Sequence, residues 1–358
     1  MDKEKLMLSY LAGALDGDGS FSILKKSSGV GVTRKSIRHR PCLQLYGLSE
    51  MLTHLLKEYL GGSVGVRKGV MKKSGKISNP QFYWSLIGAE ASILALKKIC
   101  EYLVIKKERA KFLLDFLINH EFSPIGNRKE LSPEILIQRE NAYIKMREFN
   151  DEQLISEDSL SKRSCIISDD PMVLSYLAGL MDTDGSFSVS RQKPSGKCIN
   201  FRYNSIIQLN QSNVKSINFI KENFSKGKCF IAKNAGSKLG AVYRFYISGI
   251  EKCSLFLEKI IPYLRVKKEN AKILLKFCEG YSLTKRCEDG IPFDQLDFRE
   301  QCYQELIYLN KYGIFKPSLI DLDGQKLAYR AEDDSHRERL SERDAISVCD
   351  SLDTSIAY

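Results

Sequence analysis

Two pairs of aspartates, each within the pattern Asp-x-Asp-Gly-Ser-Phe, are the residues of this 358-residue sequence best suited to chemistry. The first pair is Asp16 and Asp18, and the second pair is Asp182 and Asp184. Each pair closes a segment of helical periodicity, so its carboxylates meet the negative end of a helix dipole. An acidic group placed there twice needs a cation, and Mg²⁺ held by one or two carboxylates and water is the natural candidate.

Other interpretations of the Asp-x-Asp-Gly pattern must be weighed. A calcium-binding loop begins in the same way but requires a glutamate at its twelfth position. The residues at that position are Ser27 and Lys193, which excludes such a loop. A phosphatase-type Asp-x-Asp would follow a strand, whereas these pairs follow helical segments. A purely structural capping role for both aspartates of a pair stays open.

The aspartates end two copies of one sequence, LSYLAGALDGDGSFSI in residues 8–23 and LSYLAGLMDTDGSFSV in residues 174–189. Apolar or small residues occupy nearly every position before the aspartates, which predicts a helix buried on all sides. Gly13 and Gly179 lie in the middle of these helices, where glycine is unfavourable. They indicate close approach of another backbone, and the other copy is the expected partner.

The stretches LAGALDGDG at Leu11–Gly19 and LAGLMDTDG at Leu177–Gly185 resemble the motif of the LAGLIDADG homing endonuclease family, in its single-chain, two-motif form. Two matches in one basic chain, each followed by the same strand start, are far more specific than one. The resemblance implies two antiparallel sheets that form a saddle over double-stranded DNA, with the motif helices packed at a pseudo-twofold axis. It also implies a monomer that cuts both strands of an intron-insertion site with Mg²⁺ or Mn²⁺.

By the same resemblance, the last acid of each motif binds a divalent metal near a scissile phosphate. These acids are Asp18 and Asp184, and the carbonyl groups of Gly17 and Thr183 occupy the auxiliary ligand positions. A metal so placed would polarise the phosphate, lower the pKa of a bound water and stabilise the leaving oxygen. The first aspartate of each pair is expected to tie down the helix end instead.

The family also commonly places a lysine at the start of the last helix of each repeat, near the phosphate and water network. Lys106 and Lys267 are the matching residues, and catalytic roles are expected for both. A glutamine often follows the second strand, and Gln211 fits that position, whereas the first copy has Gly47 there. The sequence therefore predicts two unequal pockets.

The elements that position these residues are expected in the order αββαββα in both copies. In the first copy they are the motif helix, strands 20–25 and 37–46, a helix near 51–59, strands 64–68 and 81–87, and helices 89–103 and 106–118. In the second copy they are helix 172–181, strands 186–190 and 201–210, helix 214–224, strands 228–233 and 242–248, and helices 251–263 and 267–278. A further helix is expected at 133–149 and at 292–309.

Four antiparallel strands with helices on one face make a two-layer α+β domain. We therefore expect a first repeat in residues 1–150, a Ser/Asp/Glu-rich linker at 151–170, a second repeat at 171–320 and an acidic, disordered tail at 321–358.

The sheet face opposite the helices must then be polar, and arginine and glutamine are the side chains that read guanine and adenine edges. The residues expected to contact DNA are Arg38, Arg40, Gln44 and Arg67 in the first copy and Arg202, Asn204, Gln208 and Arg244 in the second. Any one of them could be an ordinary solvated strand residue, so the argument depends on the whole face.

The charge of the chain agrees with a nucleic-acid partner. The formal net charge is +11. Residues 321–358 contain ten acidic and five basic residues, so the preceding 320 residues carry a net charge of about +16. Ten cysteines are scattered without a Cys-x-x-Cys pair, which predicts reduced core thiols and no zinc site. The sequence contains no apolar run of about 18 residues, so no membrane-spanning segment is predicted.

Two other functions fit the same fold: an intron RNA maturase and a DNA-binding regulator that no longer cleaves. Both metal-binding acids and both lysines are present, which favours cleavage because binding alone needs no metal carboxylates. A mitochondrial or chloroplast location is what the family resemblance implies.

Overall fold

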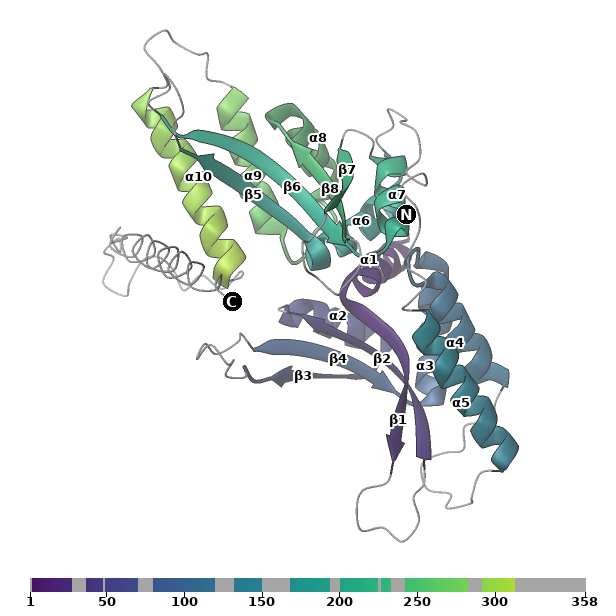
Figure 1. Ribbon diagram of the computed structural model, residues 1–358. Helices are drawn as coiled ribbons and strands as arrows, with labels where there is room; N and C mark the ends of the chain where they lie inside the picture. The colour runs from purple at the N-terminus through teal and green to yellow at the C-terminus, as the bar shows by residue number, and fades with distance from the viewer. Residues whose placement is uncertain are drawn as a thin grey trace, which may run out of the picture. The chain divides into compact units, whose positions relative to one another are not determined.

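The two sequence repeats fold into two copies of one arrangement, each built on a four-stranded antiparallel sheet (Figure 1). This computed structural model describes residues 2–27, 37–47, 49–69, 80–119, 132–149, 168–193, 200–224, 227–232, 242–282 and 292–312. The predicted tail and all but the last three residues of the predicted linker lie outside these ranges. The described residues belong to one unit, Met1–Ile314, in which the cores of the two repeats are continuous.

The elements follow the predicted order in both repeats. The first repeat contains α1 (Lys3–Asp18), β1 (Gly19–Ser27), β2 (Ile37–Gly47), α2 (Glu50–Leu60), β3 (Ser63–Arg67), β4 (Gln81–Ile87), α3 (Ala89–Ile99), a 3₁₀ turn (Cys100–Tyr102), α4 (Lys107–Asn119) and α5 (Pro133–Glu148). The second contains α6 (Pro171–Asp184), β5 (Gly185–Gln192), β6 (Arg202–Gln211), α7 (Val214–Asn223), β7 (Lys228–Ala232), β8 (Val242–Ser248), α8 (Ile250–Ile260), α9 (Lys268–Ser282) and α10 (Phe293–Tyr312). The helix predicted at 89–103 is shorter, because its last turn tightens into the 3₁₀ form before extended Leu103.

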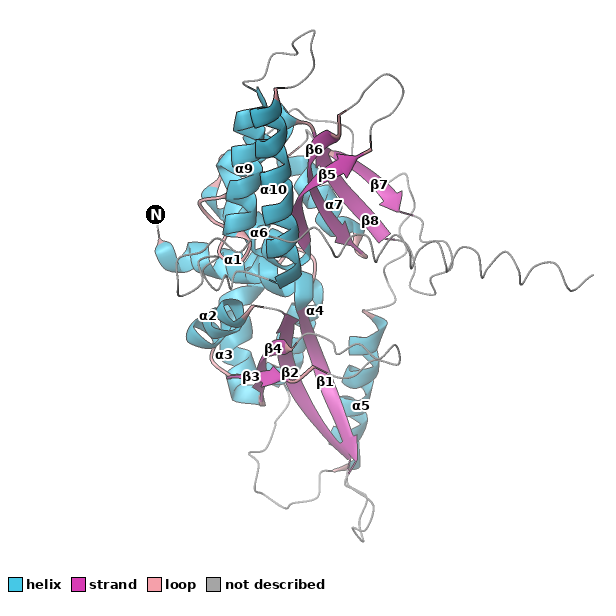
Figure 2. Cartoon of the chain, turned by 90° about the vertical axis from the view of Figure 1, so that its left-hand side faces the viewer, coloured by secondary structure: helices cyan, strands magenta, loops and turns pink. Residues whose placement is uncertain are grey.

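Helices cover one face of each sheet, and the other face is left open. The strand orders are β1-β2-β4-β3 and β5-β6-β8-β7, and α2, α3 and α4 contact the first sheet as α7, α8 and α9 contact the second (Figure 2). Phe21 and Leu43, paired across β1 and β2, are fully buried under the helices. Their neighbours Ser22 and Gln44 keep partial exposure on the opposite face. The predicted two-layer α+β architecture is confirmed.

The motif helices α1 and α6 pack directly against each other through their glycines. A Cβ at Gly13 would lie 2.0 Å from the carbonyl oxygen of Tyr176, and a Cβ at Gly179 would lie 1.9 Å from that of Tyr10. No carbon atom fits at such distances, so only glycine lets the two backbones cross here. The predicted close approach between the two copies is confirmed, and it brings the two helix ends to one place.

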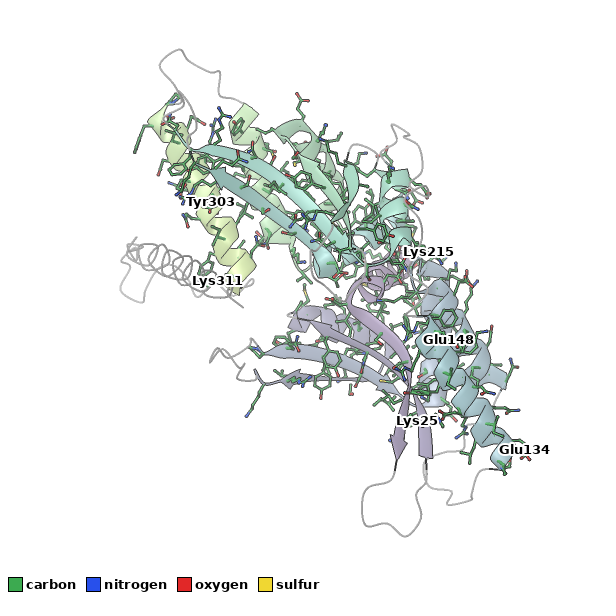
Figure 3. All side chains as sticks on the ribbon, viewed as in Figure 1. Lys25, Glu134, Glu148, Lys215, Tyr303 and Lys311 are labelled. Carbon is green, nitrogen blue, oxygen red and sulfur yellow. The ribbon has the colours of Figure 1, made fainter. Side chains whose placement is uncertain are left out.

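The last helix of each repeat braces the outer end of a strand pair. Glu140 of α5 accepts hydrogen bonds from Lys25 Nζ at 2.6 Å and pairs with His39 Nε2 at 2.9 Å. Glu300 of α10 holds the equivalent positions Arg191 and Tyr203 in the second repeat. Figure 3 shows Lys25 beside α5 and Tyr303 on α10. These contacts fix the strands whose open faces carry the candidate DNA-binding residues.

Candidate functional site

The C-terminal ends of α1 and α6 meet, and this junction brings the two motif acids together. A Cβ at Gly17 would lie 2.1 Å from Thr183 Oγ1 and 2.8 Å from Asp184 Oδ2, so the last turns of the helices are in contact. Asp18 ends α1 and Asp184 ends α6, each directly before the strand that enters its sheet. One carboxylate from each repeat therefore lies at a shared centre.

The electrostatics of this centre disfavour two ionised carboxylates in the absence of a cation. Desolvation, and then the charge of Asp18, raise the pKa of Asp184 to about 6, although Lys106, Gln211 and Lys267 act against the shift. The pKa of Asp18 is also raised, chiefly by desolvation, although its side chain keeps an exposed edge. Two such groups side by side are a natural place for a divalent cation, whose charge would favour ionisation of both.

Asp16, two residues earlier, performs a different task. Its Oδ2 accepts hydrogen bonds from the backbone N–H of Val104 at 2.7 Å and of Ile105 at 2.9 Å, and its Oδ1 accepts from Lys106 N–H at 2.8 Å. The hydroxyl of Tyr176, from the other motif helix, donates to Oδ2 at 2.7 Å. This carboxylate is 1% exposed. It ties the end of α1 to the segment before α4 and to α6, the holding role expected of it.

Asp182 repeats this arrangement with the roles of the two copies exchanged. It accepts from the backbone N–H groups of Arg265, Val266 and Lys267 at 2.7–3.0 Å, and from the hydroxyl of Tyr10 at 2.8 Å. Burial raises the pKa of both tyrosines well above the ordinary value. Each motif thus supplies the tyrosine that completes the other motif's hydrogen-bond set.

The two predicted lysines lie at the helix ends and contact carbonyl oxygens in this structure. Lys106 Nζ donates to the carbonyls of Leu15 at 2.9 Å, Gly17 at 2.9 Å and Gly19 at 2.7 Å. A cation there caps the negative end of the α1 dipole. Burial is the main reason that the pKa of Lys106 falls to about 8.

Lys267 makes the matching set in the second repeat. Its Nζ donates to the carbonyls of Met181 at 3.2 Å, Thr183 at 2.8 Å and Gly185 at 2.6 Å, and burial lowers its pKa. Each lysine therefore contacts one of the two predicted auxiliary ligand carbonyls, at Gly17 or Thr183. A carbonyl oxygen has two lone pairs and can also face a metal. The lysines' predicted contact with phosphate stays a prediction.

Gln211 and Gly47 are structurally equivalent, and they make the two pockets unequal. Gly47 lies opposite Phe82 and Gln211 opposite Tyr243 in matching registers. The side-chain amide of Gln211 donates to Asp184 Oδ2. At Gly47 a Cβ would meet its nearest neighbour, a Leu45 side-chain carbon, only at 3.7 Å. The first pocket therefore has space where the second has an amide.

Neither residue that could replace this amide does so. Ser49 uses its Oγ to accept from Leu52 N–H at the start of α2. Tyr46 lies on the open face of the sheet, where its ring packs against Tyr83.

The predicted DNA-binding residues are distributed over the two open faces. Strand register places Arg40, Gln44 and Arg67 on the first open face and Arg202, Asn204, Gln208 and Arg244 on the second. Arg38 lies opposite Lys26 on β2, and its side chain is outside the described part. Both open faces therefore carry the predicted polar residues, and contact of these residues with DNA stays a prediction.

Within the described residues, no three His, Cys, Asp or Glu side chains form a cluster able to hold a metal. The candidate ligands are instead Asp18, Asp184 and nearby carbonyl oxygens, an all-oxygen set of the kind that a magnesium-type ion prefers. The cysteines at 42, 100, 229, 253, 278 and 302 are free, as expected. No described helix is long and apolar enough to cross a membrane.

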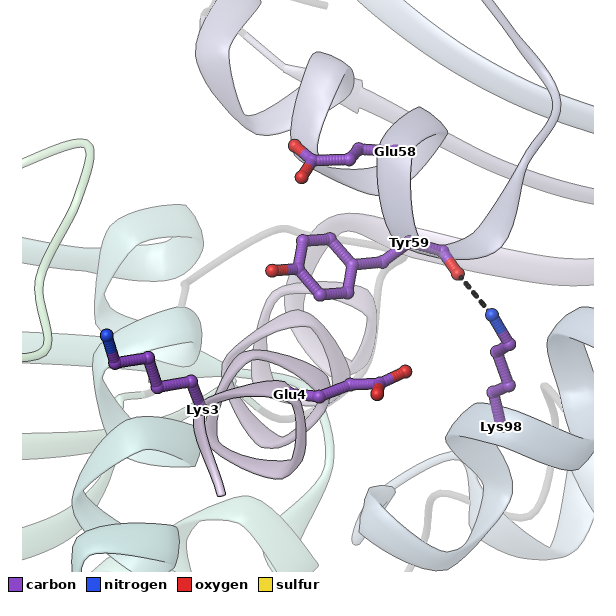
Figure 4. A pocket seen from close by; sticks show the side chains of 5 residues that line it. All are labelled: Lys3, Glu4, Glu58, Tyr59 and Lys98. Carbon is purple, nitrogen blue, oxygen red and sulfur yellow. Dashed lines mark hydrogen bonds between the residues drawn. The ribbon is translucent and has the colours of Figure 1, made fainter. Parts of the chain in front are cut away.

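A surface hollow lies at the opposite end of α1 and does not contribute to this site (Figure 4). It is lined by Lys3, Glu4, Glu58, Tyr59 and Lys98, and Lys98 Nζ donates to the Tyr59 carbonyl at 3.2 Å. Lys3 and Asp18 are fifteen positions apart on the helix, about 22 Å at the α-helical rise. This mixture of lysines and glutamates resembles an ordinary solvated surface.

Comparisons with known proteins agree with this geometry. Residues 177–281 match the family model described as LAGLIDADG endonuclease. The structure of I-LtrWI, a LAGLIDADG homing endonuclease bound to target DNA, is 14% identical, with a TM-score of 0.61 over 85% of this chain and 98% of that chain. I-SmaMI, bound to uncleaved DNA target in the presence of calcium ions, is 16% identical, with a TM-score of 0.58 over 83% and 97%.

A third structure, of the LAGLIDADG homing endonuclease I-GzeII in complex with a DNA target, is 16% identical, with a TM-score of 0.56 over 83% of this chain and 97% of that one. No curated protein matches the chain by sequence. The resemblance to LAGLIDADG homing endonucleases in their single-chain, two-motif form is confirmed, and so is the fold.

The sequence did not predict the two tyrosines or the carbonyl contacts of the lysines. A signal for the tyrosines was present, because Tyr10 and Tyr176 occupy the same position in two helices predicted to be buried, and a buried hydroxyl needs a partner.

Proposed function

We propose that this LAGLIDADG-type chain is a site-specific endonuclease that cuts both strands of double-stranded DNA at an intron-insertion site. The observation that supports this best is the meeting of Asp18 and Asp184 at the junction of two helix ends, one from each repeat. A protein that only binds DNA or RNA gains nothing from two acids held where desolvation and mutual repulsion oppose their ionisation.

The proposal includes Mg²⁺, or Mn²⁺, as the cofactor. Asp18 and Asp184, with the carbonyls of Gly17 and Thr183, would hold it. When bound, a divalent ion polarises the scissile phosphate and lowers the pKa of a bound water. The chain's own residues prepare this site: each buried lysine holds three carbonyls of a helix end, and Gln211 orients the Asp184 carboxylate.

The two open sheet faces are the proposed DNA-binding surface, forming the saddle over the duplex. Their arginines and polar side chains, on a body with about sixteen net positive charges, suit phosphate contact and base reading in the major groove. Two repeats in one chain already supply both halves of this surface, so we propose that one monomer acts on an asymmetric site. An organellar location, in a mitochondrion or chloroplast, belongs to the same proposal.

The test is cleavage of a duplex that spans the intronless host junction, with Mg²⁺ and the full chain. We expect Asp18→Asn and Asp184→Asn each to abolish double-strand cleavage, while target affinity stays within a few fold because phosphate contacts supply most of it. Glu58→Gln, an exposed acid in the remote hollow, is the control and should cleave normally. Full cleavage by either aspartate variant would exclude the proposed chemistry.

Two rival outcomes are separable in the same experiment. Tight binding to intron RNA without any DNA cleavage would favour a maturase, and DNA binding without cleavage would favour a regulator. Sedimentation of the DNA complex tests the monomer, because two chains per duplex would contradict it.

A further inference from the structure

The two open sheet faces differ in chemistry at the row of residues nearest the motif acids. On the first sheet this row pairs Tyr46 of β2 with Tyr83 of β4. On the second sheet the equivalent register positions pair Asn210 of β6 with Arg244 of β8. An aromatic pair and a polar, charged pair thus occupy the same place in the two repeats.

A glycine leaves the space that the aromatic pair occupies. Tyr83 lies opposite Gly65 of β3, where any Cβ would approach the tyrosine ring within 2.6 Å. The ring of Tyr83 therefore lies over a residue with no side chain, and the ring centroid of Tyr46 is 5.9 Å away. Tyr46 is 39% exposed, so an ordered aromatic surface faces outward.

The polar pair is held by a hydrogen bond between its own members. Arg244 Nε donates to Asn210 Oδ1 at 2.7 Å, which fixes the plane of the guanidinium on the open face. An oriented guanidinium is the group that binds the O6 and N7 atoms of guanine in a bidentate manner. An aromatic ring instead offers apolar contact of the kind that favours the thymine methyl group.

Register places both pairs beside the proposed cleavage centre. Leu45 lies opposite Gly19, so Tyr46 is one step further, beside the helix end that carries Asp18. Asn210 directly precedes Gln211, whose amide contacts Asp184. Side chains on one strand face repeat about every 6.8 Å, close to two base-pair rises of 3.4 Å. These pairs are therefore the innermost base-contacting residues. The bases that they face lie about two base pairs closer to the cleavage centre than the bases proposed for Gln44 and Gln208.

We infer that these two pairs set the sequence preference next to the cleavage site and that they do so differently in the two half-sites. The Tyr46–Tyr83 pair selects an A·T pair through the thymine methyl group, and Arg244, oriented by Asn210, selects guanine at the symmetry-related position. This inference rests on the proposed DNA-binding function and names the bases that its innermost residues prefer.

The test exchanges the two pairs between the repeats. The full chain is first used to select bound duplexes from a randomised library, which defines the target and each position's preference. The selection is repeated with Tyr46→Asn/Tyr83→Arg and with Asn210→Tyr/Arg244→Tyr. Each exchange should convert the preference at one innermost position only, from A·T to G·C in the first half-site and the reverse in the second. The expected change is roughly 5- to 150-fold in relative affinity, the contribution of one bidentate base contact.

Controls separate base reading from general damage. Ile87→Ala changes an exposed residue on the same strand and open face, about 14 Å from Tyr83, and should leave the innermost preference intact. Tyr83→Phe keeps the ring and removes the hydroxyl, so it should keep the A·T preference. If an exchanged chain unfolds, the single change Tyr46→Asn decides the question, because it removes only the exposed ring.

The outcomes also separate this inference from the proposed function. Failure of the unmodified chain to select any duplex would refute the DNA-binding function itself. A selected site whose innermost preferences are the same in the exchanged and unmodified chains would refute the inference and leave the function standing.

Discussion

Asp16→Asn should destabilise this protein far more than Asp18→Asn, although the two acids are two positions apart at one helix end. Asp16 is 1% exposed and accepts four hydrogen bonds, three from backbone N–H groups and one from the Tyr176 hydroxyl. Asp18 is exposed on one side and its pKa is raised, so folding gains no stability from its charge. The matched pair thus distinguishes an acid that holds the fold from an acid that serves chemistry.

The size of the effect follows from the hydrogen bonds of Asp16. An asparagine has one acceptor oxygen, which can replace Oδ2 and keep three donors satisfied. Its amide nitrogen then faces the N–H of Lys106, which loses its acceptor. Losing one charge-assisted bond costs about 1.5–3 kcal/mol, and the other three weaken because the acceptor is neutral. The expected loss is about 3–5 kcal/mol, as for breaking a buried charged pair.

Asp18→Asn acts in the opposite direction. It removes one of the causes that raise the pKa of Asp184 to about 6, namely the neighbouring negative charge. In the absence of metal at neutral pH, the free energy of unfolding should therefore stay unchanged or increase slightly.

Urea denaturation at pH 7 in a chelating buffer measures both effects. The single tryptophan, Trp84, is fully buried in the first repeat and reports its unfolding by fluorescence. Asp182→Asn should reproduce the Asp16→Asn loss, because its carboxylate has the equivalent partners and accepts from Tyr10. Similar denaturation midpoints for Asp16→Asn and Asp18→Asn would refute the assignment of separate roles.

Three further predictions concern the helix contact, the metal site and the unequal pockets. Gly13→Ala places a carbon 2.0 Å from the Tyr176 carbonyl oxygen and should lower the free energy of unfolding by at least about 1–3 kcal/mol. The loss should appear as a lower melting temperature, and an unchanged melting temperature would contradict the close packing. The raised pKa of Asp184, about 6, means that between about pH 4 and 6 the folded state holds this proton while the unfolded chain has released it. Metal-free stability should therefore fall as the pH rises from about 4 to 6, and Mg²⁺ binding should weaken as the pH falls below about 6. The contribution of Asp184 to both pH effects should disappear in Asp184→Asn, which leaves that of Asp18. Gln211→Gly should slow the strand cut through Asp184 by roughly 5- to 150-fold, and Gly47→Gln should speed the other strand, whereas equal single-turnover rates on end-labelled strands in all forms would count against unequal pockets.

Local sequence patterns were sufficient for the elements and for the helix contact. Apolar residues in β1 alternate with serines, so the buried face that includes Phe21 could be assigned before any strand pairing was known. Gly13 and Gly179 indicated a backbone contact because nothing else explains glycine in a buried helix. The paired Asp-x-Asp-Gly motifs located the ends of both motif helices, because the glycine after the aspartates indicates where each helix stops.

Contacts between distant residues were beyond such patterns. The hydrogen bond from Tyr10 to Asp182 joins residues 172 positions apart, and periodicity carries no information about which buried hydroxyl meets which carboxylate. The lysines were placed near the site correctly, but their carbonyl contacts depend on how the segment before α4 folds onto α1. That segment is itself held by Asp16, so the position of Lys106 follows from a tertiary hydrogen-bond set.

The same tertiary hydrogen bonds explain how one chain can combine a symmetric helix junction with open sheet faces that differ between the repeats. Tyr176 completes the hydrogen bonds of Asp16, and Tyr10 completes those of Asp182, so a change in either motif removes a partner from the other repeat. The helix junction is therefore constrained as a unit. The open sheet faces carry no such reciprocal bonds between the described residues of the two repeats, so Tyr83 in one sheet can correspond to Arg244 in the other at no cost to the junction. A single chain built in this way suits an asymmetric DNA site, because recognition can differ between the halves while the two acids stay together.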